Sequence, residues 1–599
     1  MINEPQGTQK TGGLFTGDSL QRLIFLVAII GIGWAIFAHY HPTKPPPSQQ
    51  EKQLTKGAII DAFGEMAPEE QEPVLAAIEG IYRIRREEPE KADAIDQALA
   101  LFQKGDPSRA EDILRTHLRE KEQAGRGALR EAAAAARNLA AIVYLHDTHK
   151  ALETYRKAVD LDPEELDGWL QLGRVALRAG DSGQAWAAFQ ELDRRARGES
   201  HLHWQAIALS QLGDMDALNG NSAGALMRYR QAQSLFMQWA TQDPSDPQRQ
   251  RDLSVSFDRV GDMHKANGDG AQALTAYQEM LSIRKRLVML EPKNTPWRQD
   301  LSVSHSKIGD IHLANGDGTQ ALAAYQEGLS IREKLVNLDP KNTEWQQDLW
   351  MSHNKVGDIH FANDSGAKAL AAYQEGLRIA RELVALDPKN TEWQRDLSVS
   401  HNKIGDIHLT NSSRAEALTA YQEGLSIREK LVNLDPKNTE WRRDLSVSHT
   451  KVGDVHLANS DGAEALAAYQ EGLSIREELV SLDPANMEWQ RDLSVSHNKI
   501  GDMHKANGSG AEALAAYQDG LRIARELVAL DPQRVEWKTD LVVSYVKMAG
   551  MAADTVQQAD WLRRALVVLE PLAREGRLSV EKSGWIDLIK TELAKREAG

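Results

Sequence analysis

Residues 390–436 read NTEWQRDLSVSHNKIGDIHLTNSSRAEALTAYQEGLSIREKLVNLDP, and the chain repeats this stretch with a period of 48 residues. The dipeptide Asp-Leu marks the period and begins at Asp252, Asp300, Asp348, Asp396, Asp444, Asp492 and Asp540. Periods of this size are typical of solenoids, in which each repeat buries its apolar face against its neighbours. A stacked array of this kind is primarily a surface that binds other molecules.

Two helices are predicted in each repeat. In the first, Trp393, Leu397, His401, Ile404 and His408 follow one another at helical spacing and share one face. In the second, two rows of residues seven apart face neighbouring helices, and they are Ala417, Gly424 and Leu431 in one row and Leu418, Leu425 and Val432 in the other. We therefore expect the second helix to pack on two sides.

Capping signals are predicted to begin both helices. Thr391 and Gln394 have the spacing of a capping box before the first helix, and Ser413 and Glu416 have it before the second. The same pattern recurs at Thr343 with Gln346, Asp461 with Glu464, and Ser509 with Glu512. Between the helices, Gly or Asn is expected to supply the left-handed residue that ends the first helix.

The small and aromatic residues of the repeat resemble a known family. Gly405, Ala417, Tyr421 and Gly424, followed by Asp435-Pro436, resemble the signature of a tetratricopeptide repeat. The resemblance implies an all-α, right-handed superhelical solenoid of antiparallel helix pairs. The period of 48 exceeds the usual value of about 34, so both helices are expected to be long. His401 stands where the family usually has Trp or Leu, and His408 stands where it usually has Tyr. HEAT-like pairs of about 40 to 47 residues are the alternative fold, but the Gly, Ala and Tyr offsets argue against them.

Composition excludes some classes of function. The formal net charge is −16, and no basic stripe is visible, so nucleic acid is not expected as a partner. The chain has no cysteine, which excludes disulfides and thiolate chemistry but assigns no compartment.

A membrane anchor is predicted near the N-terminus. Leu23 to Ala38 contains no charged residue, and Tyr40 extends this stretch to the lower limit of about 17 residues for a span. A cleavable signal peptide ending near Ala38 is the alternative. The prolines in residues 41–50 favour an extended spacer. We expect a single-pass protein of the cell (inner) membrane, and the basic residues on both flanks leave its orientation open.

These features divide the chain into six segments. They are an N-terminal tail at 1–22, a transmembrane helix at 23–40, a Pro-rich tether at 41–58, a divergent TPR-like helical region at 59–250, six 48-residue repeats at 251–540, and C-terminal capping helices at 541–599.

Histidines recur in two rows along the predicted array. One row is His305, His353, His401, His449 and His497, and the other is His264, His312, His360, His408, His456 and His504. A role in metal binding or pH sensing is one interpretation. Packing is the favoured one, because Phe257 and Tyr545 take the place of histidine at the ends of the first row. No metal site is therefore predicted.

A binding face is predicted on the other side of the first helix. By the family resemblance this face lines the concave surface that holds extended peptides. Its candidate residues are Asn354, Lys355, Asp358, Asn402, Lys403, Asp406, Lys451, Asp454, Asn498, Lys499 and Asp502. A row of Asp beside a row of Lys can grip a peptide of mixed charge. In the alternative interpretation Lys403 and Asp406, three residues apart, pair only with each other.

No catalytic motif and no cofactor motif is present in the sequence. The sequence therefore predicts a non-catalytic, membrane-anchored scaffold that binds a protein or peptide partner. A sensory module that responds to a ligand or metal and a self-associating structural subunit are the alternatives.

Overall fold

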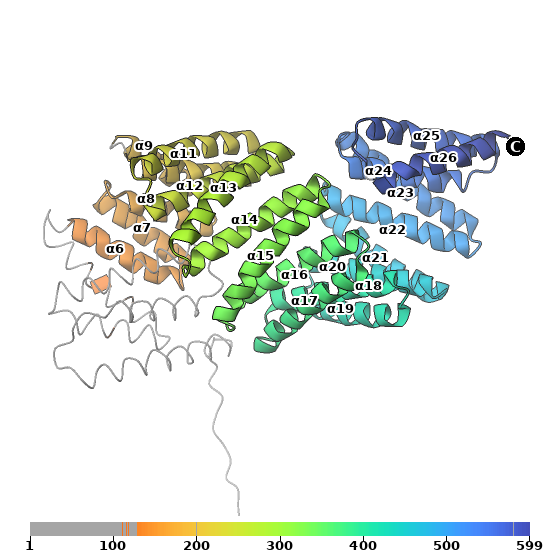
Figure 1. Cartoon of the computed structure of the whole chain (residues 1–599), viewed down its shortest axis with the longest axis horizontal. Coiled ribbons are helices and arrows are strands. Elements are labelled where there is room, and N and C mark those ends of the chain that lie inside the picture. Colours follow the sequence, from red (N-terminus) through yellow and green to blue (C-terminus); the bar gives the residue numbers. More distant parts are fainter. Residues whose placement is uncertain are drawn as a thin grey trace, which may run out of the picture. The chain divides into compact units, whose positions relative to one another are not determined.

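The computed structural model describes residues 129–198, 201–578 and 580–598, with a few isolated positions between residues 97 and 118. Every regular element in these residues is an α-helix, and α6 to α26 follow one another along the chain (Figure 1). The predicted all-α class is therefore confirmed for the part of the chain that the structure describes. The chain divides into two compact units between Leu287 and Val288, inside α13.

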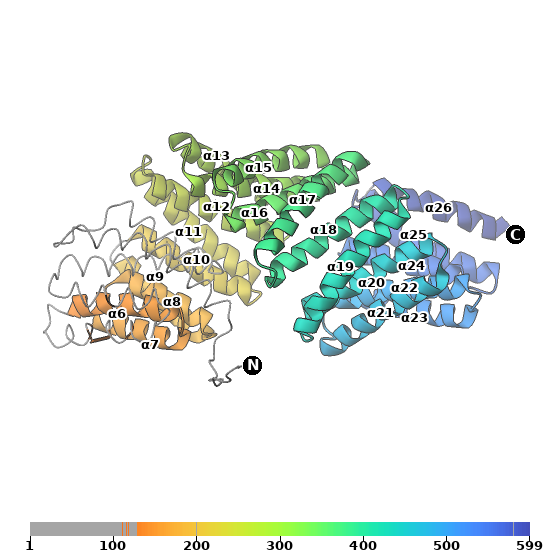
Figure 2. The same cartoon turned by 90° about the horizontal axis from the view of Figure 1, so that it is seen from below.

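The described part of the first unit consists of four successive helix pairs. They are α6 (Leu129–Tyr144) with α7 (Thr148–Leu161), α8 (Leu166–Arg178) with α9 (Ser182–Gly198), α10 (Leu202–Leu218) with α11 (Ser222–Gln242), and α12 (Pro247–Ala266) with α13 (Gly270–Leu290). Neighbouring helices lie side by side from α6 to α12 (Figures 1 and 2). Small residues such as Ala132, Ala136 and Ala140 are fully buried in this unit.

The second unit continues the pairwise pattern to the C-terminus. Its pairs are α14 (Thr295–Ala314) with α15 (Gly318–Leu338), α16 (Thr343–Ala362) with α17 (Gly366–Leu386), α18 (Thr391–Thr410) with α19 (Arg414–Leu434), α20 (Thr439–Ala458) with α21 (Gly462–Leu482), α22 (Met487–Ala506) with α23 (Gly510–Leu530), and α24 (Val535–Ala549) with α25 (Thr555–Arg574). The last helix, α26 (Val580–Ala598), packs on α25. The predicted long helices are confirmed, because the repeated pairs have 20 and 21 residues.

In each pair from α10–α11 to α22–α23, a glycine of the first helix packs against a tyrosine of the second. A Cβ atom at Gly405 would lie only 2.5 Å from the ring of Tyr421, so no side chain fits there. Tyr421 and Ala417 are fully buried, as the family resemblance implies. Further along the second helix, Gly424 approaches the carbonyl oxygen of Ser398 near the start of the first. The two helices are thus antiparallel.

The first helix of a repeat is capped by a different residue from the one that the sequence predicted. Asn390, not Thr391, is the N-cap of α18, and its Oδ1 accepts a hydrogen bond from the Trp393 amide at 3.1 Å. Asn342 caps α16 in the same way. The predicted capping boxes at Thr391 and Thr343 are therefore wrong by one residue, because Asn390 and Asn342 are the last extended residues before the helices and their side chains cap the amides three positions later.

The second helices begin where the sequence predicted. Ser413, Asp461 and Ser509 are the N-cap residues of α19, α21 and α23, but none of the three side chains accepts a capping hydrogen bond. Asp317 does accept one, from the Gln320 amide at 3.0 Å.

The predicted left-handed residue lies one position later than Asn in each turn. Asn411 and its counterparts have negative φ, and the next residue has positive φ. That residue is Gly268, Gly316 or Gly508 in three repeats and Asp364, Ser412 or Ser460 in the other three. The prediction of Gly is confirmed in three of the six long repeats, whereas the prediction of Asn is wrong.

The predicted transmembrane helix at 23–40 and the tether at 41–58 lie outside the described residues. Among the residues that are described, none of the helices is both long and apolar enough to cross a membrane. The right-handed superhelical course stays a prediction.

Candidate interaction face

A tyrosine of the second helix is hydrogen-bonded to an aspartate of the first in each long repeat. The Tyr373 hydroxyl donates to Asp358 Oδ1 at 2.5 Å, and the two residues are 15 apart in the chain. Burial and this hydrogen bond raise the pKa of Tyr373 far above its ordinary value. The phenol therefore stays protonated and fixes the carboxylate. The same bond joins Tyr277 with Asp262, Tyr325 with Asp310, Tyr421 with Asp406, Tyr469 with Asp454, and Tyr517 with Asp502.

A lysine from the following repeat completes the arrangement. Lys403 Nζ lies 2.5 Å from Asp358 Oδ1, and its ammonium group also lies over the Tyr373 ring, 5.3 Å from the centroid. We call these repeated groups the Lys-Asp-Tyr ladder. Its Lys-Asp pairs are Lys355 with Asp310, Lys403 with Asp358, Lys451 with Asp406, Lys499 with Asp454, and Lys547 with Asp502.

The first unit has its own version of this group. Arg259 Nη2 donates to Asp214 Oδ2 at 3.0 Å, and the Tyr229 hydroxyl donates to the other oxygen of the same carboxylate at 2.6 Å. Arginine here takes the place of the ladder lysine.

The structure thus places the predicted lysines and aspartates together, but with partners that the sequence did not predict. Lys403 contacts Asp358 of the preceding repeat, 45 residues earlier, and not Asp406 on its own helix. The alternative interpretation, in which Lys403 and Asp406 pair within one helix, is therefore wrong. Asp406 instead accepts from Lys451.

The asparagines of the predicted binding face are buried. The exposed fractions of Asn354, Asn402 and Asn498 are 6%, 7% and 8%. Asn402 lies against Gly424, and with its amide oxygen turned toward Arg428 it accepts from Nη1 at 2.9 Å. A glycine in each second helix lets that helix close over the amide, and the binding role of these asparagines stays a prediction.

The lysines and aspartates remain accessible. Side-chain exposure is 26% for Lys403 and 45% for Asp358, and it is 33% and 30% for Lys451 and Asp406. Leu313 and Leu457 lie one turn after Asp310 and Asp454 and are 44% and 45% exposed. The first helices thus present charged pairs beside apolar side chains.

The described histidines of the two rows lie buried or partly buried between packed helices. His305 and His401 are buried, and burial lowers the pKa of His353, His401, His449 and His497. His401 Nδ1 lies 2.8 Å from Glu423. The described part of the chain contains no cluster of three or more potential metal ligands.

A buried arginine network escaped the sequence interpretation. Arg428 is 4% exposed, and it donates to Ser398 in its own repeat and to Ser448 in the next, at 3.0 and 2.8 Å. Arg476 bridges Ser446 and Ser496 in the same manner, whereas Arg332 joins Ser352 to a different serine of its own repeat, Ser306. The Ser-x-Ser that recurs in most of the first helices was the available signal, because buried hydroxyls need hydrogen-bond partners.

One repeat replaces this network with a tryptophan. Ala380 stands where four of the other long repeats have the buried arginine and the last has Ala524, and Trp350 stands where all five have the first serine. The Trp350 indole donates to Ser400 at 2.7 Å, which is the bond that an arginine at 380 would make, and it packs against Ala380. Two changes in sequence thus compensate each other in space.

A second set of contacts between repeats joins residues 49 apart. Arg395, Arg443 and Arg491 bind Asp444, Asp492 and Asp540 at 2.5 to 2.6 Å. Gln299 and Gln347 take the arginine position in front of Asp348 and Asp396. These aspartates belong to the Asp-Leu pairs that define the period.

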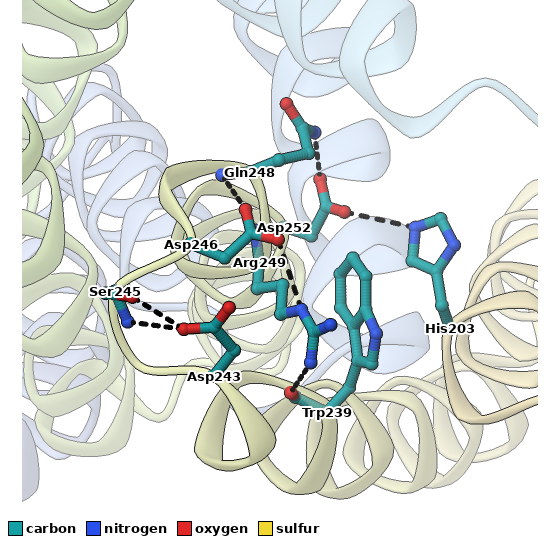
Figure 3. Close-up of polar contacts among 8 residues, drawn as sticks. All are labelled: His203, Trp239, Asp243, Ser245, Asp246, Gln248, Arg249 and Asp252. Atoms are coloured by element: carbon teal, nitrogen blue, oxygen red, sulfur yellow. Dashed lines mark hydrogen bonds and ion pairs between the residues drawn. The ribbon is translucent and has the colours of Figure 1, made fainter.

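In the first unit, a histidine that stacks on a tryptophan contacts the aspartate in place of the arginine. His203 Nε2 lies 3.1 Å from Asp252 Oδ2, again 49 residues apart. Figure 3 shows the Trp239 ring between the His203 imidazole and the Arg249 guanidinium, with centroid distances of 4.1 and 5.0 Å. Arg249 is also held by Asp246. Trp239 here supplies the aromatic ring, since Arg249 occupies the position of the repeated Trp.

Comparison with known families supports the interpretation of the helix pairs. Residues 141–200 match a tetratricopeptide repeat model. The tetratricopeptide repeat family is therefore supported. The match covers the end of α6 and all of α7, α8 and α9, within the more divergent part of the array. No curated protein sequence matches the chain.

Solved structures overlap the array only loosely. BtubC from P. vanneervenii is 18% identical over 42% of this chain and 90% of its own, with a TM-score of 0.34. Yeast Tom70 is 13% identical over 85% of this chain and 96% of its own, with a TM-score of 0.36. At these values the superpositions establish neither a shared fold nor a shared function.

Proposed function

We propose that the chain is a non-catalytic tetratricopeptide scaffold that is anchored in the cell (inner) membrane through residues 23–40 and holds an extended segment of a protein partner along its first helices. The repetition and exposure of the Lys-Asp pairs carry this proposal. An extended partner can meet equivalent groups at each repeat, because the groups recur with the period of the array.

The ladder pairs suit exchange with a partner's charges. Exposed ion pairs are worth only about 0 to 1 kcal/mol each, so a carboxylate or ammonium group of a peptide can replace one member at little cost. Tyr373 keeps Asp358 in place during such an exchange through its own hydrogen bond. Exposed leucines one turn away, such as Leu313, add apolar contact.

Affinity capture with a matched pair of variants tests this function. The ladder variant carries Asp358→Asn, Asp406→Asn and Asp454→Asn, which remove three charges and keep an acceptor for each tyrosine. The control variant carries Glu333→Gln, Glu429→Gln and Glu477→Gln, which remove three exposed charges from second helices. Both variants change the net charge equally, so general electrostatic attraction affects them alike.

We expect the ladder variant to lose at least about tenfold in affinity for its captured partner, while the control keeps its affinity. Equal capture by the two variants would contradict binding along the first helices. Protease accessibility of the array in intact cells and in spheroplasts tests the anchor and its orientation. Release of the full chain from membranes by salt alone would contradict an integral anchor.

A further inference from the structure

A row of exposed leucines runs along a different edge of the second unit. Each long second helix ends with a leucine, and we call the row the leucine edge. Its members are Leu290, Leu338, Leu386, Leu434, Leu482 and Leu530, which are 61%, 60%, 63%, 67%, 61% and 70% exposed. An exposed proline lies two positions after each leucine, as Pro340 does after Leu338. The edge therefore presents an exposed apolar side chain at every repeat.

The leucine is the same in all six copies, whereas the residue just before it varies. The residue just before it has diverged to Met289, Asn337, Ala385, Asn433, Ser481 and Ala529. The leucine itself is kept in all six copies, although most of its side chain lies outside the core. Exposed apolar groups that recur in a row mark contact surfaces.

The charges beside the leucines point to the occupant. Four of the six loops carry an acid directly after the leucine and a lysine two residues later, for example Asp339 with Lys341 and Asp435 with Lys437. These loops are locally neutral in a chain of net charge −16. Two copies of the chain repel each other generally, so they can approach most readily where the local charge cancels.

We propose that the leucine edge binds the leucine edge of a second copy of this chain. In a two-fold arrangement the same surface serves both copies, and the acid of one loop meets the lysine of a loop in the partner. A lipid surface fits less well, because every loop of the edge carries an acidic residue. This surface lies at the ends of the second helices, so the inference is independent of the proposed function.

Sedimentation velocity of the full chain tests the inference with two serine variants. The edge variant replaces Leu338, Leu386, Leu434 and Leu482 by Ser. The control variant replaces Leu218, Val556, Val567 and Leu588 by Ser, and these side chains are 70% to 79% exposed elsewhere in the molecule. Circular dichroism checks that both variants fold.

We expect the wild type and the control variant to form dimers with the same dissociation constant and the edge variant to dissociate at least about 100-fold more readily. A wild type that stays monomeric at about 100 µM overturns the proposal, as does an edge variant that associates as tightly as the control. So does a monomeric wild type that binds phosphatidylcholine vesicles through these leucines.

A charge exchange keeps the proposal testable if the edge variant fails to fold. One variant carries Lys341→Glu and Lys437→Glu, and the other carries Asp339→Lys and Asp435→Lys. We expect each to associate weakly with itself and the mixture to recover association at low salt. Failure of the mixture to associate more tightly than either variant alone contradicts an edge-to-edge contact.

Discussion

The carboxylate of Asp396 faces a neutral amide, whereas Asp444, Asp492 and Asp540 face arginines. Gln347 donates to Asp396 at 3.1 Å, whereas Arg395 binds Asp444 at 2.6 Å. Burial raises the pKa of Asp396 to about 7, nearby Glu392 raises it too, and the Gln347 hydrogen bond offsets this only in part. The folded state therefore favours the protonated acid at this contact.

We predict that Gln347→Arg stabilises the chain at pH 8 by about 1 kcal/mol and has little effect at pH 4. The unfolded aspartate has a pKa of about 3.9, so the cost of ionising Asp396 is complete above about pH 7 and absent below about pH 4. The arginine removes that cost by pairing with the ionised form. Urea unfolding at the two pH values measures the change.

The reverse exchange at the next repeat is the control. Arg395→Gln should destabilise the chain at pH 8, because Asp444 then loses its charged partner. Equal effects of Gln347→Arg at both pH values would show that the arginine acts through packing and not through the Asp396 carboxylate.

Trp350 and Ala380 offer a second test with single residues. Trp350→Ser should cost about 3 to 5 kcal/mol, since it leaves a cavity beside Ala380 and removes the donor to Ser400. Adding Ala380→Arg should recover at least half of this loss, because the pair then matches Ser398 and Arg428 of the following repeat. A double-mutant cycle in urea measures the coupling. Additive effects of the two changes would refute the exchange.

At the level of the turns between helices, three repeats carry backbone strain that the others avoid. Asp364, Ser412 and Ser460 have φ values of 53°, 60° and 65°, and glycine occupies this position in the other three long repeats. A side chain at positive φ is unfavourable, because Cβ crowds the following carbonyl group. The divergence of the turn sequence thus weakens individual helix ends without changing the fold.

We predict that Ser412→Gly raises the stability of the chain by about 0.5 to 1 kcal/mol. Gly316→Ala should lower it by a similar amount, although open space surrounds Gly316, because only the backbone conformation is affected. Thermal unfolding of both variants measures the two changes. A loss of stability in Ser412→Gly would mean that the entropy of the unfolded chain outweighs the relief of strain.

At the level of the whole molecule, residues that contact within a repeat were easier to predict than those that contact between repeats. The helix pairs and the packing of Gly405 on Tyr421 follow from spacing within 48 residues. The partner of Lys403 does not, because Asp358 lies 45 residues earlier and only stacking brings the two together. The burial of Asn402 was missed although its contact is within one repeat, because it depends on how closely Gly424 lets the two helices approach. Spacing indicates a face of a helix, whereas the neighbour that covers it comes from the fold.

Because contacts between repeats join equivalent positions, the array should tolerate the loss of one whole repeat. Deletion of residues 391–438 joins Asn390 to Thr439 and recreates the sequence Asn-Thr-Glu-Trp at the junction. Lys451 then stands where Lys403 stood and can pair with Asp358. We expect the shortened chain to keep its helix content per residue and to unfold with a smaller urea m-value, since less surface is exposed on unfolding.

Deletion of residues 391–413 alone removes one helix of a pair and leaves Tyr421 without Gly405, so it should unfold part of the array. Circular dichroism with urea titration separates the two outcomes, and equal damage from both deletions would contradict a stack of equivalent repeats.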